Sequence, residues 1–593
     1  MATMHNGSSQ QNIRQLVDHG ERIGAVGSPS TTSEFTIDIF GRAVDKKLVG
    51  ELGIIRYTQD GKDHYALGQI TEVMMRNVML EQSVGRGIVR ERERWDAVQE
   101  RQDTHTATMS LSAVFAVEGN NIQPSILGTV PSTGTSVHLV NDDLLRALLQ
   151  PHQSEIFYLG RLYGSRPLLP MWFKHFDVGV GGAGEAYHVG IFGKTGSGKS
   201  VLSKMILTAY ARHSRMGLFV LDPQGEFAKG IHVSQMELGG FPMAAVFNTH
   251  VLQKLGRISK IYDISNLILD RWEIFVEFIL RFGFFEHVGI KSSQYQSTTA
   301  EYVEEYLKNQ QNIKLEDLHR DETLNGVLEY VSSIADKIYA QGEGANRVRE
   351  KSKSAKTDSF VRNKWRQITS LFAERHGAKR VDRIIETVFS PTWRSRPIVI
   401  IDLSRHPDDI PHNVWEEEVK PLLIQRFLKA IIREAEEAYK RNQSLNTLVV
   451  VDEAHRLAPR ERVEKERWAS VKSTLVDAVR TTRKYGLGWM FISQTLSSLD
   501  RDIVSQLRLM FFGFGLGSGT ELQALRELVG GEREYLKLYQ SFRDPHSAFG
   551  DQLRSYSFMA LGPVSPLSFA GTPLFFDAFT NSEEFFQSNG ICF

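Results

Sequence analysis

The chain has 593 residues, too many for a single hydrophobic core, so two or more domains are expected. Its 70 basic residues balance its 70 acidic ones, which excludes a strong overall attraction to nucleic acid or anionic lipid, and 41% hydrophobic residues are typical of a folded chain. The single cysteine, Cys592, excludes a disulfide framework and a cysteine-based metal cluster and suits a reducing compartment.

The sequence has no recognisable membrane-targeting pattern. Its N-terminal residues are polar and lack the basic-then-apolar order of a signal peptide. No uncharged apolar run approaches the roughly 20 residues that span a bilayer. We therefore expect a cytoplasmic protein without a membrane segment.

Short alternating runs of apolar and polar residues follow an N-terminal extension at residues 1–33. Phe35, Ile37 and Ile39 alternate with polar residues, and glycines recur at hairpin-like intervals up to residue 134. This pattern predicts a small β-barrel or sandwich over residues 34–155. We expect a domain without catalytic chemistry there, because no catalytic cluster lies in it.

Prolines and glycines over residues 156–186 predict a linker, after which apolar runs alternate with helical segments. Runs that are apolar on both faces are typical of a parallel sheet covered by helices, so we predict an α/β core at residues 187–251 and 393–576. Residues 252–392 have helical spacing and predict a helical insertion, and residues 577–593 form a C-terminal tail.

A basic stretch lies within the predicted insertion. Residues 343–368 are rich in lysine and arginine, with little apolar content before Trp365. We expect a mobile connector there, with a solvated surface favoured over a nucleic-acid contact.

A phosphate-loop motif, G-x-x-x-x-G-K-[ST], ends an apolar run in the stretch GIFGKTGSGKS. Its glycines let backbone N–H groups surround phosphate oxygens, and the next helix directs its positive end at them. We expect Lys199 to reach the β and γ phosphates and the Ser200 hydroxyl to bind Mg²⁺. The residues predicted to bind ATP here are Gly193, Thr195, Gly196, Ser197, Gly198, Lys199, Ser200 and Val201.

Acidic and amide side chains end two later apolar runs. Asp452 and Glu453 follow LVVV, which predicts that Asp452 supports Mg²⁺ and that Glu453 accepts a proton from the attacking water. Gln494 ends GWMFIS, where a neutral amide can contact a γ-phosphate or a water. A glutamine that only caps the strand is the alternative.

The helix predicted before Gln494 ends in cations. Val471, Leu475 and Val479 have the spacing of its inward face, and Arg480 and Arg483 lie near its C-terminal end. The helix dipole favours cations at that end. The alternative is that one arginine completes the nucleotide site of a neighbouring subunit, a device worth about 10³ to 10⁵ in rate.

Several segments, taken in order, resemble the HerA family of the HerA/FtsK translocases. These are GKTGSGKS, DPQGEF, IDLS, VDEAH and RKYGLGWMFISQ. The resemblance implies a RecA-like P-loop ATPase core with a helical insertion, preceded by a HAS-barrel. It also implies a homo-hexameric ring that uses ATP and Mg²⁺ to move double-stranded DNA through its central channel.

The resemblance also implies roles for single residues. Asp222 and Glu226 match an acidic pair close to the nucleotide, Gln494 matches a sensor, and Arg483 matches an arginine that acts in trans. One departure is that Thr495 follows the glutamine, where the family commonly has arginine.

HerA relatives act with separate effectors, either nucleases of the NurA type or Sir2-like enzymes. We therefore expect this chain to be the motor of such a pair, in DNA end processing or anti-phage defence, with the effector docking at the barrel. One alternative is a ring scaffold that regulates an effector with little translocation, and another is a secretion or conjugation ATPase. The string Asp-Glu-Ala-His also occurs in RNA helicases, but too few residues follow Gln494 for a second RecA-like domain.

Overall fold

The computed structural model describes residues 9–81, 103–232, 251, 254–340, 342–390, 394–405, 412–530, 533–547, 554–568 and 572–591, so Cys592 lies outside the described residues. Contacts divide the chain into two compact units. The first unit comprises Met1–His213, Val233–Lys254 and Trp489–Phe593, and the second comprises Ser214–His232 and Leu255–Gly488. Within the described ranges, every helix is too short or too polar to cross a bilayer.

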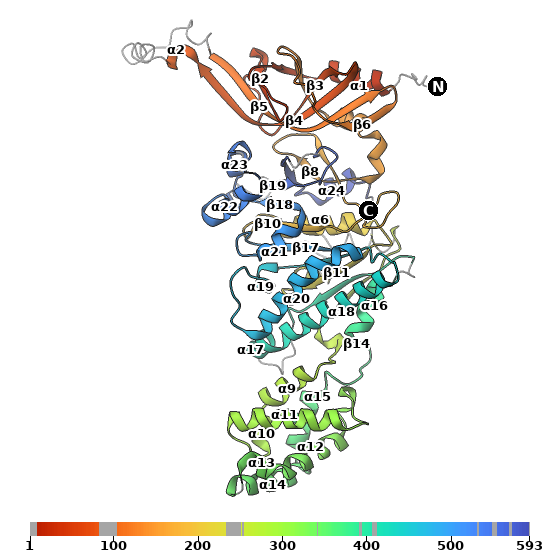
Figure 1. Ribbon diagram of the computed structural model, residues 1–593, viewed down its shortest axis with the longest axis vertical. Helices are drawn as coiled ribbons and strands as arrows, with labels where there is room; N and C mark the ends of the chain where they lie inside the picture. Colours follow the sequence, from red (N-terminus) through yellow and green to blue (C-terminus); the bar gives the residue numbers. More distant parts are fainter. Residues whose placement is uncertain are drawn as a thin grey trace. The chain divides into compact units, whose positions relative to one another are not determined.

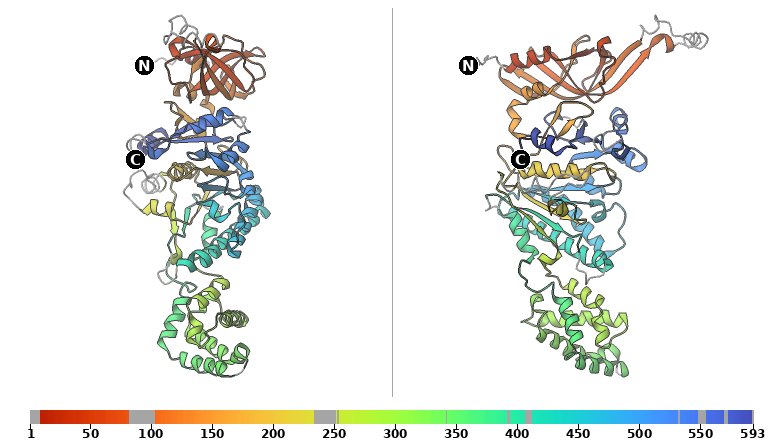
Figure 2. Two further views of the ribbon diagram at one scale, coloured as in Figure 1. Left: turned by 90° about the vertical axis from the view of Figure 1, so that its left-hand side faces the viewer. Right: turned by 180° about the vertical axis from the view of Figure 1, so that it is seen from behind.

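A closed barrel forms the N-terminal part of the first unit (Figures 1 and 2). Its strands are ordered β2-β1-β7-β3-β4-β5, and β5 pairs back onto β2, where Phe35 lies opposite Met109. Phe35 and Ile37 are fully buried in its core and Ile39 packs against it, so the alternating pattern is confirmed. The bounds are β1 Arg22–Val26, β2 Glu34–Ile39, β3 Leu52–Gln59, β4 Lys62–Asn77, β5 Asp103–Glu118 and β7 Ser136–Leu139. Strand β6 (Asn121–Ser125) pairs with β5 outside the closed circle.

The rest of the first unit is a mixed sheet that positions the phosphate loop. Strand β10 lies between β17 and β18, parallel to both, and the order continues through β19, β20, β8 and β9 with antiparallel pairing. The strands are β8 Ile156–Leu162, β9 Leu168–Trp172, β10 His188–Phe192, β17 Leu487–Ser493, β18 Leu507–Gly513, β19 Tyr556–Leu561 and β20 Leu574–Ala578. The helices are α1 Ser9–Asp18, α2 Val78–Glu81, α5 Asp142–Leu148, α6 Lys199–Ala211, α21 Arg501–Gln506, α22 Gly519–Leu528, α23 Arg533–Gln540 and α24 Ser582–Ser588.

Gln69, on barrel strand β4, joins the barrel to this sheet. Its side-chain nitrogen donates to the carbonyls of Gly50 and Phe575, at 2.8 and 3.0 Å, and its oxygen accepts from the Phe575 N–H at 2.9 Å. The Gln69 side chain is buried, so these hydrogen bonds replace the ones that its amide would make to water in the unfolded chain. The barrel and the start of β20 are therefore held together by a fully bonded buried amide.

The second unit contains a parallel sheet whose described strands run in the order β12-β15-β11-β16. Every residue of β11, β15 and β16 is buried, as expected for strands covered on both faces. The strands are β11 Gly217–Asp222, β12 Ser259–Tyr262, β15 Ile398–Asp402 and β16 Thr447–Val451. The helices are α7 Glu226–His232, α16 Val381–Phe389, α17 His412–Val414, α18 Lys420–Lys440, α19 Ala454–Leu457 and α20 Glu466–Thr482.

A bundle of helices, drawn in green in Figure 1, forms the insertion of the second unit. Its core is aromatic: Phe275 packs edge-on against Trp365 and Phe372, and the Trp365 indole donates to the carbonyl of Leu318 at 2.6 Å. The helices are α9 Trp272–Arg281, α10 Phe284–His287, α11 Ser293–Asn309, α12 Asp321–Ser333, α13 Ala335–Tyr339, α14 Glu343–Ala355 and α15 Ser359–Thr369. Two short strands, β13 (Leu267–Ile268) and β14 (Lys379–Arg380), pair at its base.

The predicted α/β fold with an N-terminal barrel is confirmed, but some boundaries differ. Residues 156–186, predicted to be a linker, contain the paired strands β8 and β9, because apolar residues around the prolines and glycines alternate enough to bury one face. The barrel also begins before residue 34, since β1 pairs with both β2 and β7.

The basic stretch is helical rather than a loose connector. Residues 343–368 form α14 and most of α15, and Val348, Val361 and Trp365 are buried. The few apolar residues are spaced to lie on the inner faces of two helices, so the charges occupy the outer faces.

Candidate functional site

The phosphate loop connects β10 to α6 in the first unit. β10 is buried along its whole length, and α6 begins at Lys199, so the loop is fixed at both ends. The Lys194 N–H donates to the carbonyl of Phe514 at 2.9 Å, and the Ser197 N–H donates to the carbonyl of Lys194 at 3.1 Å. The Lys199 ammonium donates to that same carbonyl at 3.0 Å. The motif therefore has the strand–loop–helix context that phosphate binding requires.

The middle of the loop depends on glycine. Gly196 has φ +81° and Gly198 has φ +88°, a region that residues with a Cβ rarely adopt. A Cβ on Gly196 would lie 1.9 Å from Nε2 of His546, and one on Gly198 would lie 2.5 Å from the ring of Tyr556. The backbone curve that lets N–H groups surround a phosphate is thus available only to glycine here.

The structure brings two of the predicted residues together beside the loop. The Thr195 hydroxyl donates to the side-chain oxygen of Gln494 at 3.2 Å. Gln494 follows directly after β17, whose last residue, Ser493, lies opposite Phe192 at the end of β10. The segment after it is held by Glu521, which accepts hydrogen bonds from the backbone N–H groups of Leu496 and Ser497. Gln494 is therefore positioned at the phosphate loop.

Buried carboxylates gather at the ends of strands in the second unit. Asp222 ends β11 opposite Asp402 at the end of β15, and Asp452 follows β16. The carboxylate of Asp222 accepts from the N–H groups of Glu226, Phe227 and Ala228, at 3.0, 3.0 and 2.9 Å. Asp222 thus caps α7, a role that the spacing of the acidic pair did not reveal.

Burial raises the pKa of two of these acids, Asp452 and Asp222. Desolvation, together with the nearby Glu226, Asp222 and Glu453, raises the pKa of Asp452 to about 7. Desolvation also raises the pKa of Asp222 to about 6, and the adjacent Asp402 adds to this. Charge is therefore costly at this end of the sheet until a cation or donor arrives.

Glu453 has a strained backbone next to this cluster. Its φ is +49°, in the left-handed region that costs a residue other than glycine of the order of 1–3 kcal/mol. The side chain is buried, and its Oε2 lies 3.4 Å from Nδ1 of His455. Such strain persists where the surrounding structure fixes a functional side chain, as a general base requires.

Arg480 and Arg483 lie at the C-terminal end of α20. Val471, Leu475 and Val479 are buried on its inner face, as predicted, and both arginines are exposed. Their exposure is compatible with either the helix-dipole role or contact with another subunit.

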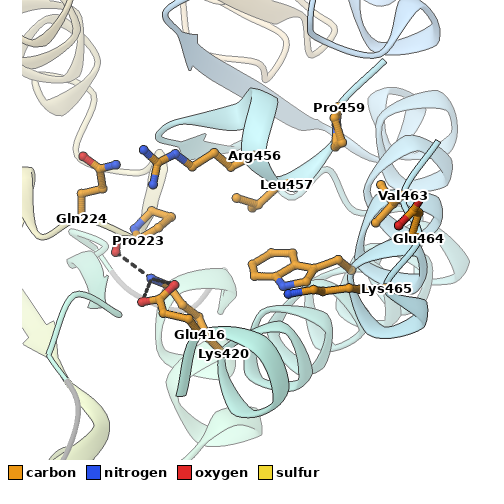
Figure 3. Close-up of a pocket in the computed structure, with 11 residues that line it drawn as sticks. Pro223, Gln224, Glu416, Lys420, Arg456, Leu457, Pro459, Val463, Glu464 and Lys465 are labelled. Atoms are coloured by element: carbon orange, nitrogen blue, oxygen red, sulfur yellow. Dashed lines mark hydrogen bonds and ion pairs between the residues drawn. The ribbon is translucent and has the colours of Figure 1, made fainter. Parts of the chain in front are cut away.

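A cavity of about 430 Å³ lies beside the acidic residues, between α18, α19 and the start of α20 (Figure 3). Pro223 and Gln224, which follow Asp222, form one wall, and Arg456 extends toward Gln224. The Lys420 ammonium donates to the Pro223 carbonyl at 3.1 Å and to the Glu416 carboxylate at 2.9 Å. The buried Lys420 therefore fixes the loop that follows Asp222.

Sequence reasoning missed three residues near these motifs. His546 and Tyr556 contact the phosphate loop from about 350 positions away, and no local spacing signals such a contact. Asp402 lies in the IDLS segment, but no local pattern places it against Asp222, because that contact follows only from the parallel pairing of β11 and β15.

Comparison with known proteins agrees with this geometry. Residues 186–435 match the protein family described as the central domain of the helicase HerA. This central segment is therefore similar to the HerA family. With its complete phosphate-loop motif, the chain is a P-loop ATPase.

Several solved structures resemble parts of the chain, at low identity and low TM-score. VirB4 of Thermoanaerobacter pseudethanolicus is 14% identical, with a TM-score of 0.34 over 72% of this chain and 97% of VirB4. The genome packaging NTPase B204 from Sulfolobus turreted icosahedral virus 2, in complex with ATP-gammaS, is 9% identical, with a TM-score of 0.27 over 66% of this chain and 96% of B204. The bacterial conjugative coupling protein TrwBdeltaN70 is 13% identical, with a TM-score of 0.35 over 75% of this chain and 92% of TrwB. None of the curated proteins matches.

The raised pKa of Asp452 predicts a pH-dependent cost in stability. The folded protein binds this proton more tightly than the unfolded chain, so the wild type loses stability as pH rises from about 4 to about 7. Asp452→Asn removes the titration. In nucleotide-free, metal-free buffer, its melting temperature should exceed that of the wild type by more at pH 8 than at pH 4.5. Exposed Glu464→Gln is the control, and an equal difference at both pH values would contradict the assignment.

Proposed function

We propose that this HerA-type chain is an ATP-driven motor that forms a homo-hexameric ring in the cytoplasm and moves double-stranded DNA through its central channel. The observation that carries the proposal is the phosphate loop, seated between buried β10 and α6 with Gln494 against Thr195. A motor needs a group that detects whether the γ-phosphate is present, and an amide hydrogen-bonded to the loop meets that need. The match to the HerA central domain supports double-stranded DNA as the polymer that the motor moves.

The proposed roles follow from the chemistry of each side chain. Lys199 and the N–H groups of the loop hold the phosphates, and Glu453 accepts the proton of the attacking water. Asp222 fixes the start of α7, which places Glu226 in the acidic group around Asp452. The structure thus supports a scaffold role for Asp222 and an electrostatic role for Glu226.

Mg²⁺ is the proposed metal, with Ser200 and Asp452 as its protein ligands. Bound Mg²⁺ would neutralise charge on the β and γ phosphates. Among the described residues, no group of three or more His, Cys, Asp or Glu side chains forms a metal site of its own. This suits Mg²⁺, which binds through one or two protein oxygens together with substrate phosphates. The raised pKa of Asp452 also fits a carboxylate that ionises fully when a cation is near.

A separate effector protein, a nuclease or a Sir2-like enzyme, is proposed to dock at the barrel in DNA end processing or anti-phage defence. The supporting observation is apolar exposure on β4 where it extends beyond the barrel core. Val73, Met74 and Met75 are 39%, 51% and 55% exposed there. Val73 and Met75 share one face of the strand and Met74 lies on the other, and exposed apolar side chains of this kind are typical of a protein–protein contact.

Two substitutions distinguish ATP binding from ATP hydrolysis. Lys199→Ala should abolish ATP binding, because the ammonium that meets the phosphates is gone. Glu453→Gln should bind ATP but hydrolyse it about 10² to 10⁴ times more slowly, because the amide accepts no proton. Calorimetric titration and phosphate release measure the two effects, with Glu464→Gln as the control. Normal turnover in Glu453→Gln would exclude it as the base.

Mixed rings test whether Arg483 acts on the neighbouring subunit. Arg483→Ala and Glu453→Gln should each be inactive alone. A mixture should recover activity, because some interfaces then combine an intact Glu453 with an intact Arg483. Native mass spectrometry establishes that mixed rings form. No recovery in such rings would leave Arg483 with the helix-dipole role, and Arg480→Ala tests the second candidate in the same way.

A further inference from the structure

A histidine from the C-terminal part of the first unit lies directly against the phosphate loop. A Cβ built on Gly196 would lie 1.9 Å from Nε2 of His546, 2.6 Å from Cδ2 and 3.1 Å from Cε1. Nε2 is therefore the ring atom nearest the middle glycine of the loop. His546 is nonetheless exposed, so the contact leaves much of the ring accessible.

The turn that presents His546 contains a buried proline and two hydrogen bonds to Asp544. It is a short 3₁₀ turn, Pro545–Ser547, whose proline is buried. The side chain of Asp544 accepts the His546 N–H at 2.9 Å, and the Asp544 carbonyl accepts the Ser547 hydroxyl at 2.7 Å. The buried proline and these hydrogen bonds fix the backbone from which the imidazole extends toward Gly196.

The segment before the turn is anchored to the same strand end that holds the loop. The Tyr539 hydroxyl donates to the Gly513 carbonyl at 2.5 Å and accepts the Leu516 N–H at 3.1 Å. The carbonyl of Phe514, between these two, accepts the Lys194 N–H of the phosphate loop. One short stretch after β18 thus positions both the loop and the histidine-bearing segment.

We propose that His546 is a nucleotide-contacting residue, whose Nε2–H donates to the phosphate–ribose part of ATP bound in the loop. In the described part of the chain, neither ring nitrogen of His546 has a hydrogen-bond partner. An anion surrounded by the N–H groups of Gly196 and its neighbours would supply an acceptor within reach of that ring. The inference rests on the proposed ATP site and extends it to a segment outside the P-loop motifs.

Paired substitutions distinguish hydrogen bonding from simple packing. His546→Phe keeps a ring against Gly196 but has no N–H, and His546→Gln keeps an N–H donor without the ring. His546→Ala removes both. His19→Ala is the matched control, because His19 is an exposed histidine of the same unit that bonds only to the Gln15 carbonyl within its own segment.

Calorimetric titration with Mg·ADP, which is not turned over, measures affinity in each variant. We expect His546→Ala and His546→Phe to bind about tenfold more weakly, because a hydrogen bond to a charged group is lost. His546→Gln should stay within about threefold of the wild type, and His19→Ala should match it. Melting temperatures of the nucleotide-free proteins show which variants fold.

Wild-type affinity in His546→Phe would overturn the proposal, because packing alone would then suffice. Affinity in His546→Gln as weak as in His546→Ala would also overturn it. If His546→Ala does not fold, the Phe and Gln variants decide. If the wild type binds no Mg·ADP, the ATP site itself is wrong. A third outcome is that the wild type binds Mg·ADP, Lys199→Ala does not, and all His546 variants bind it with wild-type affinity. The ATP site is then correct and only the proposed role of His546 is wrong.

Discussion

Burial of β10 on both faces and both edges fixes where the phosphate loop begins. The strand has parallel neighbours on either side, so a shift by one residue would break two sets of backbone hydrogen bonds and misplace every side chain. Because Phe192 is held in this register, Gly193 starts the loop at one position. Lys199 then begins α6, and Gln494 emerges from β17 within reach of Thr195. The C-terminal segment adds a further constraint, since the end of β18 binds Lys194 and Tyr539 at neighbouring residues.

In the second unit, burial makes charge costly at the ends of the strands. Apolar strands end in Asp222, Asp402 and Asp452, so the cost of desolvating charge accumulates at one edge of the sheet. Backbone N–H groups of α7 and the Ser404 hydroxyl offset part of it for Asp222 and Asp402. Asp452 receives less compensation, and its pKa rises further than that of Asp222. A divalent cation would therefore stabilise the ionised carboxylate of Asp452 the most. This electrostatic cost at the strand ends supports a catalytic role for the site.

Much of the site was predictable because its chemistry is local in sequence. The phosphate loop, the Asp452–Glu453 pair and the inward face of α20 each depend on residues within a few positions of one another. His546 was not predictable, because the contact with Gly196 is set by how β18 and the segment after it fold back. Asp402 required the pairing of β11 with β15. The β8–β9 strand pair was mistaken for a linker because its prolines and glycines are also what a linker contains, and only burial separates the two.

In the proposed motor, ATP hydrolysis moves this protein along duplex DNA. Triplex displacement measures that movement directly, because a motor that tracks along the duplex strips off a labelled third strand. With ATP and Mg²⁺, the wild type should release the third strand at a rate that falls to background in Glu453→Gln. ATP hydrolysis at an undiminished rate without release of the third strand would contradict the claim.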